Sequence, residues 1–124
     1  MANQLSLFAP PSVPVYLPPF VHEILRACQS IGARIVRGHW GVGLHGRKWV
    51  LVGDSCCPLS ALLIAKKAAA ESGDNSAAPS VSRLLGITDQ EVYEFNRGFD
   101  GHGPGNGSKW FEYGQLVALE LGFK

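Results

Sequence analysis

The residues best suited to chemistry are a cysteine and two histidines near the middle of the chain. Cys57 is followed by Pro58, a residue favoured at the first position of a helix. A helix N-terminus lowers the pKa of a nearby thiol, and the thiolate is the nucleophilic form. His39 and His45 precede this helix and could supply the base of a Cys–His pair. A thiol-dependent enzyme using Cys57 is therefore one hypothesis.

The same segment also suits a structural cysteine. Cys56-Cys57-Pro58-Leu59 leads directly into an apolar helix, and cysteine is commonly a small buried hydrophobic residue. No third residue that would orient a histidine stands out in the sequence. We therefore interpret the Cys57 thiol as packed inward, and we expect no catalytic residue.

Metal and phosphate sites are disfavoured by residue spacing. Cys56 and Cys57 could join His39 and His45 around zinc, but adjacent cysteines lack the usual C-x₂₋₄-C spacing. Four glycines between positions 38 and 46 are followed by a strand, not by the helix N-terminus of a phosphate cradle. The glycine-rich segment 100–106 has too few carboxylates for a calcium loop. We expect neither a metal nor a cofactor.

A second candidate site lies between Ser80 and Gly98, a segment that resembles a helix-turn-helix. Leu85-Gly86-Ile87-Thr88 has the pattern of the turn, and Val92 and Phe95 take the inward positions of the second helix. The outward residues that could touch nucleic acid are Gln90, Tyr93, Asn96 and Arg97. Acidic residues at 89, 91 and 94 share the outward positions, and phosphates repel carboxylates. A small DNA-binding regulator is the alternative hypothesis, and two helices joined by a tight turn is the preferred interpretation.

The first nineteen residues differ in composition from the rest of the chain. Five prolines fall between positions 10 and 19, and proline disfavours both helices and central strands. We expect an extended, polyproline-like arm over residues 1–19. Its apolar residues are too many for a solvated tail, so they either bind a partner or fold back onto the domain.

Gln4-Leu5-Ser6-Leu7-Phe8 in this arm resembles the bacterial sliding-clamp binding motif, Q-L-x-L-F, at every specified position. The resemblance implies that Gln4 anchors by side-chain hydrogen bonds while Leu7 and Phe8 fill an apolar pocket on the clamp. Leu5 would pack at the edge of that pocket. The implied protein is a non-enzymatic accessory factor, bacterial or phage, that is recruited to DNA replication or repair by a protein–protein interaction.

Composition limits the class of protein. The 124 residues, 46% of them hydrophobic, are enough for one packed domain. A net charge of +1 gives no bulk attraction to nucleic acid or to an anionic membrane. The sequence has neither a secretory signal nor a membrane-spanning run, and three cysteines argue for reduced thiols. We expect a cytoplasmic protein with no membrane contact and no strong direct binding to nucleic acid.

Residues 20–124 are expected to form a single α+β domain, in which a β-hairpin packs against about four to five helices. The hairpin is predicted within residues 33–53. Helices are predicted from about 20 to 30, from 57 to about 72, from 80 to 85, from the T-x-x-E capping box at 88–91 to the loop at 100–107, and after the cap Ser108.

Overall fold

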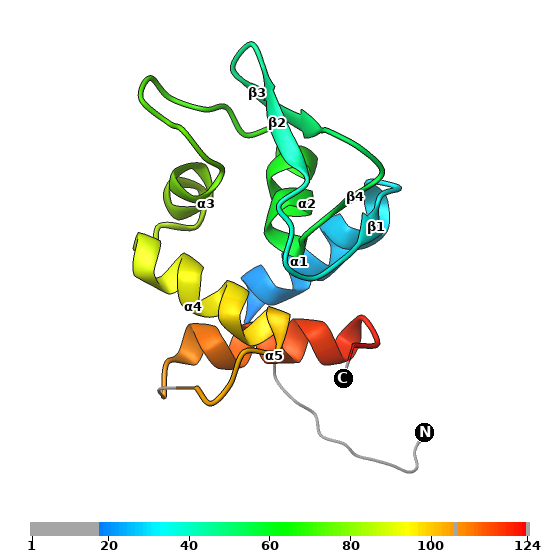
Figure 1. Ribbon diagram of the computed structural model, residues 1–124, viewed down its shortest axis with the longest axis vertical. Coiled ribbons are helices and arrows are strands. Elements are labelled where there is room, and N and C mark those ends of the chain that lie inside the picture. Colours follow the sequence, from blue (N-terminus) through cyan, green and yellow to red (C-terminus); the bar gives the residue numbers. More distant parts are fainter. Residues whose placement is uncertain (1–17, 106, 124) are drawn as a thin grey trace.

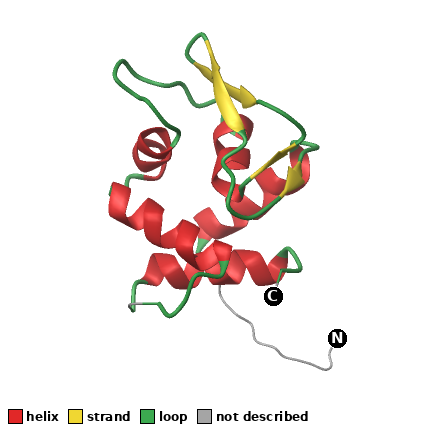
Figure 2. Ribbon diagram, viewed as in Figure 1, coloured by secondary structure: helices red, strands yellow, loops and turns green. Residues whose placement is uncertain are grey.

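The computed structural model describes residues 18–105 and 107–123, which form an α+β domain (Figure 1). Its elements are, in chain order, α1 Pro19–Ser30, β1 Arg34–Ile35, β2 Val42–His45, β3 Lys48–Leu51, β4 Ser55–Cys56, α2 Pro58–Ala65, α3 Ala78–Leu85, α4 Asp89–Asp100 and α5 Lys109–Glu120. β2 and β3 pair as an antiparallel hairpin, and β1 pairs with β4 in parallel. The predicted fold class, a hairpin with helices around it, is confirmed (Figure 2). None of the helices in the described ranges is long and apolar enough to span a bilayer.

Helix starts and stops follow their local signals. The Thr88 hydroxyl accepts the Glu91 N–H, and the Glu91 carboxylate accepts the Thr88 N–H, which completes the predicted capping box. The Ser108 hydroxyl accepts the Trp110 N–H at 3.2 Å and caps α5. Gly86 ends α3 with φ +69°, in the left-handed region that favours glycine.

The hydrophobic core lies between α1, α2, α4 and α5. The predicted inward residues of α4, Val92, Phe95 and Phe99, are at most 1% exposed. On α5, Val117 is in the core, whereas Trp110 and Tyr113 are half-buried. These two rings instead hold the start of α1, because Phe20 stacks on Trp110 at 4.5 Å and meets Tyr113 edge-on at 5.1 Å.

α4 and α5 cross with their backbones almost in contact, in the lower half of Figure 1. A Cβ atom added to Gly98 would lie 2.0 Å from the carbonyl oxygen of Phe111. One added to Gly114 would lie 2.1 Å from the carbonyl oxygen of Phe95. Glycine at both positions is therefore required by the close approach of the two helices.

The predicted helix from 57 to about 72 is wrong in its length, because α2 ends at Ala65. Lys67 adopts φ +55°, and the chain then runs beside the hairpin. The Ala70 N–H donates to the Arg47 carbonyl at 2.7 Å, and Arg47 Nε donates back to the Ala70 carbonyl at 3.1 Å. This pairing and the burial of Ala70 override the high helix propensity of the alanine-rich segment.

The predicted hairpin is confirmed over residues 42–51 but not at its start. Arg34 and Ile35 pair with Ser55 and Cys56 instead. The Arg34 N–H donates to the Asp54 carbonyl and the Val36 N–H to the Cys56 carbonyl, each at 2.9 Å. β1 therefore passes beside the residues that lead into α2.

The Asp74 carboxylate fixes the loop that follows α2. It accepts hydrogen bonds from the Arg83 guanidinium, the Glu71 N–H and the Ser80 hydroxyl. The hydrogen bond from Arg83 is the main reason why the pKa of Asp74 is lowered to about 2. Ser80 in turn accepts the indole N–H of Trp49 at 2.8 Å, so the network connects the loop, α3 and β3.

Acid is expected to weaken the domain through Asp74. Its pKa is lower in the folded chain than the usual value of about 3.9 in the unfolded chain, so its contribution to stability is complete above pH ~4. That contribution is lost as the pH falls to about 2. The difference in unfolding free energy between the wild type and Asp74→Asn should therefore shrink between pH ~4 and ~2. Urea melts at several pH values measure it.

Asn75→Ala is the control for this experiment, because it changes the same loop without removing a titrating group. Its difference from the wild type should stay constant with pH. A difference for Asp74→Asn that is equally constant would contradict the role given to the carboxylate.

Candidate functional site

The predicted clamp-binding residues Gln4, Leu5, Leu7 and Phe8 lie outside the described residues. The described chain begins at Pro18, whose carbonyl accepts the Val21 N–H at 3.0 Å in the first turn of α1. The described domain therefore starts next to the ring cluster formed by Phe20, Trp110 and Tyr113.

Three of the sequence candidates meet at one cavity, although they are far apart in the chain. The cavity has a volume of about 240 Å³ and is named here the Trp40 cavity; it is lined by Gly38, His39, Trp40, Cys57, Asn96 and Asp100. His39 comes from the loop between β1 and β2, Cys57 from the start of α2, and Asn96 from α4. The structure thus brings the thiol candidate and one nucleic-acid candidate together.

The loop that forms one wall of the Trp40 cavity is tied to both helices. The Gly38 N–H donates to Asp100 Oδ1 at 2.9 Å, and Arg37 Nε donates to the Phe99 carbonyl at 2.6 Å. The Cys57 N–H donates to the Trp40 carbonyl at 3.4 Å. Backbone and side-chain hydrogen bonds therefore hold the cavity in shape from two sides.

Cys57 lines this cavity and is buried. Its residue is 5% exposed, and its Sγ lies 3.5 Å from the Ser60 hydroxyl. Burial raises the pKa of Cys57 more than hydrogen bonds from Ser60 lower it, and the Asp100 carboxylate raises it further. In the described ranges no hydrogen bond joins the thiol to His39 or to His45, which is exposed at the end of β2. The expected inward packing of Cys57 is confirmed.

The other two cysteines are also poor nucleophiles. Burial raises the pKa of Cys28 to about 12 and that of Cys56 to about 11. We expect the native protein to resist iodoacetamide at neutral pH and to take up three equivalents after denaturation, as measured by mass spectrometry. Fast, selective alkylation of Cys57 in the native protein would contradict this and would revive the thiol-enzyme hypothesis. Among the described residues, no group of three or more His, Cys, Asp or Glu side chains could hold a metal ion.

The four nucleic-acid candidates on α4 do not form one surface. Gln90 Nε2 donates to Glu94 at 3.0 Å, and Arg97 Nη1 donates to the same carboxylate at 3.2 Å. Tyr93 is 57% exposed, whereas Asn96 lines the Trp40 cavity. The prediction that Glu94 faces outward is wrong, because Glu94 is 4% exposed.

Arg97, the basic residue of α4, is held in place on three sides. Besides its ion pair with Glu94, it donates to the Pro104 carbonyl at 3.3 Å and lies 5.3 Å from the ring centre of Phe111. A recognition helix needs basic or polar groups that reach phosphates. Arg97 instead holds the loop before α5 against α4.

From the sequence, neither Asp100 nor Trp40 is selected as a site residue of this cavity, and Asp100 is placed in a connecting loop. The sequence nevertheless contains a signal that Asp100 has a role of its own. Asp100 is the last residue of α4, where the helix dipole disfavours a carboxylate. An acidic residue in that position indicates a role outside the helix. In the structure, the Asp100 carboxylate accepts a hydrogen bond from the Gly38 N–H.

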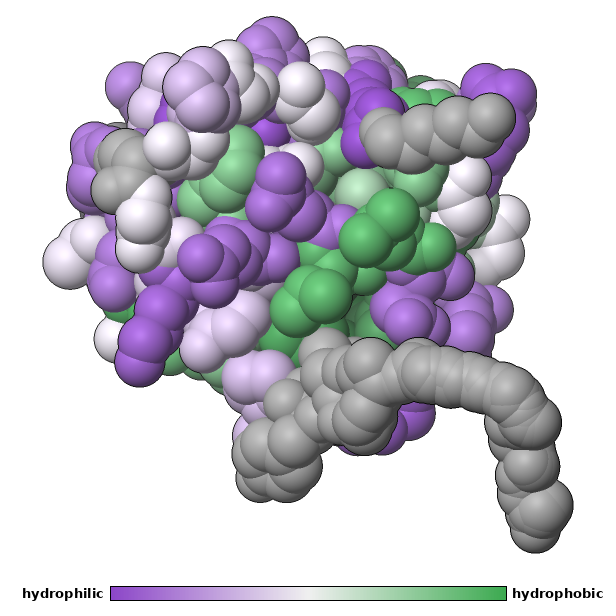
Figure 3. Space-filling view, turned by 90° about the horizontal axis from the view of Figure 1, so that it is seen from below, coloured by the Kyte–Doolittle hydropathy of each residue, from purple (hydrophilic) through white to green (hydrophobic). Residues whose placement is uncertain are grey.

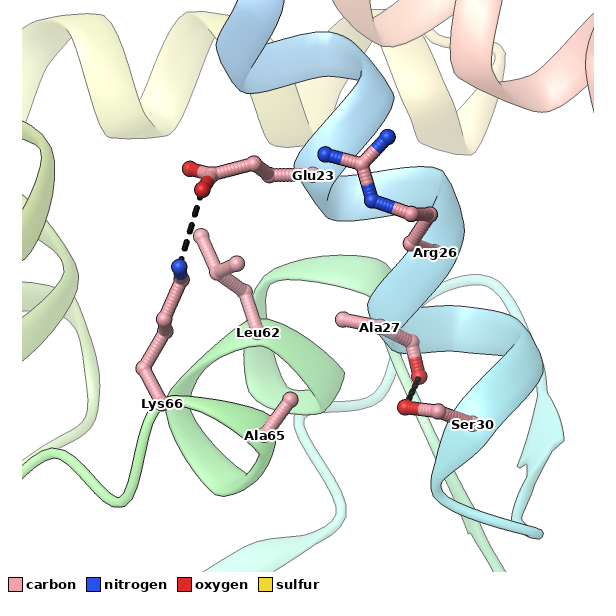
Figure 4. A pocket seen from close by; sticks show the side chains of 7 residues that line it. All are labelled: Glu23, Arg26, Ala27, Ser30, Leu62, Ala65 and Lys66. Carbon is pink, nitrogen blue, oxygen red and sulfur yellow. Dashed lines mark hydrogen bonds and ion pairs between the residues drawn. The ribbon is translucent and has the colours of Figure 1, made fainter.

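Other hollows of the described surface contain none of the catalytic or nucleic-acid candidates named above. One of about 200 Å³ lies between α1 and α2, where Glu23 and Lys66 form a 2.8 Å ion pair at its rim (Figure 4). Both side chains are about 40% exposed, so the pair contributes little to stability. Seen from below, a band of apolar side chains is bordered by hydrophilic ones (Figure 3), and Leu119 of α5 is 64% exposed. The hollow between α1 and α2 also gathers polar side chains, those of Glu23, Arg26, Ser30 and Lys66, but Glu23 and Lys66 already pair with each other.

No protein-family model, curated protein or solved structure matches this chain. The support for the two candidate sites therefore comes from the chain's own residues. The peptide at residues 4–8 is a candidate by its sequence, and the Trp40 cavity is a candidate by its geometry.

Proposed function

We propose that this protein is a non-enzymatic accessory factor, recruited to DNA replication or repair by binding the bacterial sliding clamp through residues 4–8. The observation that carries the proposal is the complete match of Gln4-Leu5-Ser6-Leu7-Phe8 to Q-L-x-L-F. In this function Gln4 supplies hydrogen bonds, and Leu7 and Phe8 supply the apolar contact. Leu5 packs beside them.

The layout of the chain supports this proposal. The described core extends from Val21 to Ala118, so binding of residues 4–8 elsewhere removes none of its side chains. Nine residues separate Phe8 from Pro18, and they span at most about 30 Å. The prolines among them restrict the free chain, which reduces the entropy lost when the peptide is ordered on a partner.

Binding to purified clamp, with and without residues 1–9, tests the proposal. The full chain should bind with a micromolar dissociation constant, equivalent to about −8 kcal/mol, which is ordinary for a short peptide in a groove. The chain of residues 10–124 should show no binding. Equal binding of the two forms would assign the interaction, if any, to the domain and would overturn the proposal.

One observation keeps the DNA-binding regulator as a second candidate. α3 and α4 are joined by a tight turn at Gly86 and Thr88, as in a helix-turn-helix. The pairing of Arg97 with Glu94 argues against it, since phosphates then meet no available basic side chain on α4. Gel-shift titration of residues 10–124 at low salt decides between the two candidates. Tight binding with a steep salt dependence would favour the regulator.

A further inference from the structure

The Trp40 cavity has a negative rather than a positive lining. Neither lysine nor arginine lines it; its titratable residues are His39, Cys57 and Asp100, and Asp100 is its one carboxylate. The Gly38 N–H fixes Asp100 Oδ1, and within the described residues no hydrogen bond engages Oδ2. A carboxylate held in place with one oxygen unpaired is suited to a hydrogen-bond donor that carries positive charge.

The other walls favour the same kind of ligand. Trp40 is half-buried and is a lining residue of the cavity, and an indole ring attracts ammonium and guanidinium groups. Asn96 is half-buried on α4, and in the described ranges its side-chain amide makes no hydrogen bond. Its N–H donors and its carbonyl acceptor are therefore both available to a ligand. Cys57 adds a buried thiol to the lining.

Size and charge favour a small cation over the competing ligand classes. A volume of about 240 Å³ equals roughly eight water molecules at ~30 Å³ each, which suits a small molecule or one end of a larger one. Cys57 caps α2, and the partial positive charge at this helix N-terminus would favour an anion. The full negative charge of Asp100 in the same cavity outweighs that half charge, so a cation is favoured.

We propose that the Trp40 cavity binds a small organic cation through an ammonium or guanidinium group, with Asp100 as its counter-ion. Trp40 packs against the cationic group, and Asn96 hydrogen-bonds to the remainder of the ligand. The site is separate from the clamp-binding peptide, and its occupation does not depend on the clamp.

Agmatine, which carries an ammonium at one end and a guanidinium at the other, is a suitable probe. It is titrated to millimolar concentration into the full-length ¹⁵N-labelled protein. The backbone amide of Gly38 and the indole N–H of Trp40 should shift, because they border the site. The indole signals of Trp49 and Trp110 serve as internal controls, since neither residue lines the cavity. Shifts confined to other residues, or none at all, would overturn the proposal.

Two variants test the assigned roles. Asp100→Asn removes the charge but keeps an oxygen that can accept the Gly38 N–H, and it should weaken agmatine binding at least tenfold. Asn96→Ala should weaken it several-fold without touching that hydrogen bond. Asp54→Asn, a change of the same kind at an 88% exposed side chain, is the matched control and should bind as the parent does.

The anion alternative is tested with inorganic phosphate in the same titration. Phosphate should leave the Gly38 and Trp40 signals unchanged. Shifts with phosphate that exceed those with agmatine, or full agmatine binding by Asp100→Asn, would show that the helix N-terminus dominates the cavity and would overturn the proposal.

Discussion

Gly98→Ala and Gly114→Ala are each expected to destabilise the domain strongly, although alanine is the better helix former. In an exposed helix this substitution stabilises by about 1 kcal/mol. Here the new methyl group would lie 2.0 Å from the Phe111 carbonyl oxygen for Gly98, or 2.1 Å from the Phe95 carbonyl oxygen for Gly114. Both obstacles are backbone atoms, so α4 and α5 must separate. We expect a loss of about 3 kcal/mol for each variant, the upper end of the usual range for overpacking.

A loss of this size is a large part of the stability of a small domain, which is about 5–15 kcal/mol. Thermal melts should show a decrease of the melting temperature by roughly 10 °C for each variant. The effects of the two substitutions should not add, because moving the helices apart once relieves both clashes.

Gly53→Ala is the control for these two variants. A Cβ atom at Gly53 would have no neighbour within 4 Å, and its φ lies outside the left-handed region, so its melting temperature should match that of the wild type. A Gly98→Ala protein as stable as the parent would show that α4 and α5 are not in close contact in solution.

The local signals of the helices predicted most of the fold. The capping box at Thr88, the cap at Ser108 and the stop at Gly86 all depend on groups within a few residues of one another, so the sequence contains them directly. The crossing of α4 and α5 could not be predicted in this way. Gly98 and Gly114 appear in the sequence only as weak helix formers, and their role arises from a contact between two helices.

Two errors in the sequence analysis have different physical origins. The alanine-rich segment after α2 is helical by propensity, but Ala70 gains hydrogen bonds to Arg47 and a place in the core. Glu94 occupies a position expected to face outward, and its burial is compensated by Gln90 and Arg97 on the same helix. For Ala70, tertiary contacts outweighed a helix preference of about 1 kcal/mol or less per residue. For Glu94, hydrogen bonds within α4 offset the cost of burying a carboxylate.

The Trp40 cavity shows how far site prediction could go. His39, Cys57 and Asn96 were selected for separate reasons, as a base, a nucleophile and a base-reading residue. Their convergence depends on the loop at 37–40 reaching both α2 and α4, through bonds such as Gly38 to Asp100, 62 residues apart. Residue types thus indicated which side chains could bind or react. The ligand class of the cavity could be inferred only from the spatial arrangement of its charged and buried groups.

Replacing both Leu7 and Phe8 by alanine is expected to abolish binding to the sliding clamp. Burial of each side chain in an apolar pocket contributes about 1.5–3 kcal/mol. Loss of both therefore removes about 4 kcal/mol or more from an interaction of about −8 kcal/mol, a weakening of roughly 1,000-fold. A micromolar complex would then fall below detection in a pull-down. A peptide of residues 1–12 should compete with the full chain for the clamp, and the peptide with both substitutions should not.

Val13→Ala together with Val15→Ala is the matched control, because it removes apolar side chains from the same arm outside the motif. This variant should bind the clamp as the parent does. Thermal melts of both double variants separate clamp binding from the alternative that the arm packs on its own domain. If Leu7 and Phe8 serve the clamp and not the domain, their loss leaves the melting temperature unchanged. A lowered melting temperature with clamp binding intact would instead assign these two side chains to the domain and end the case for recruitment by the clamp.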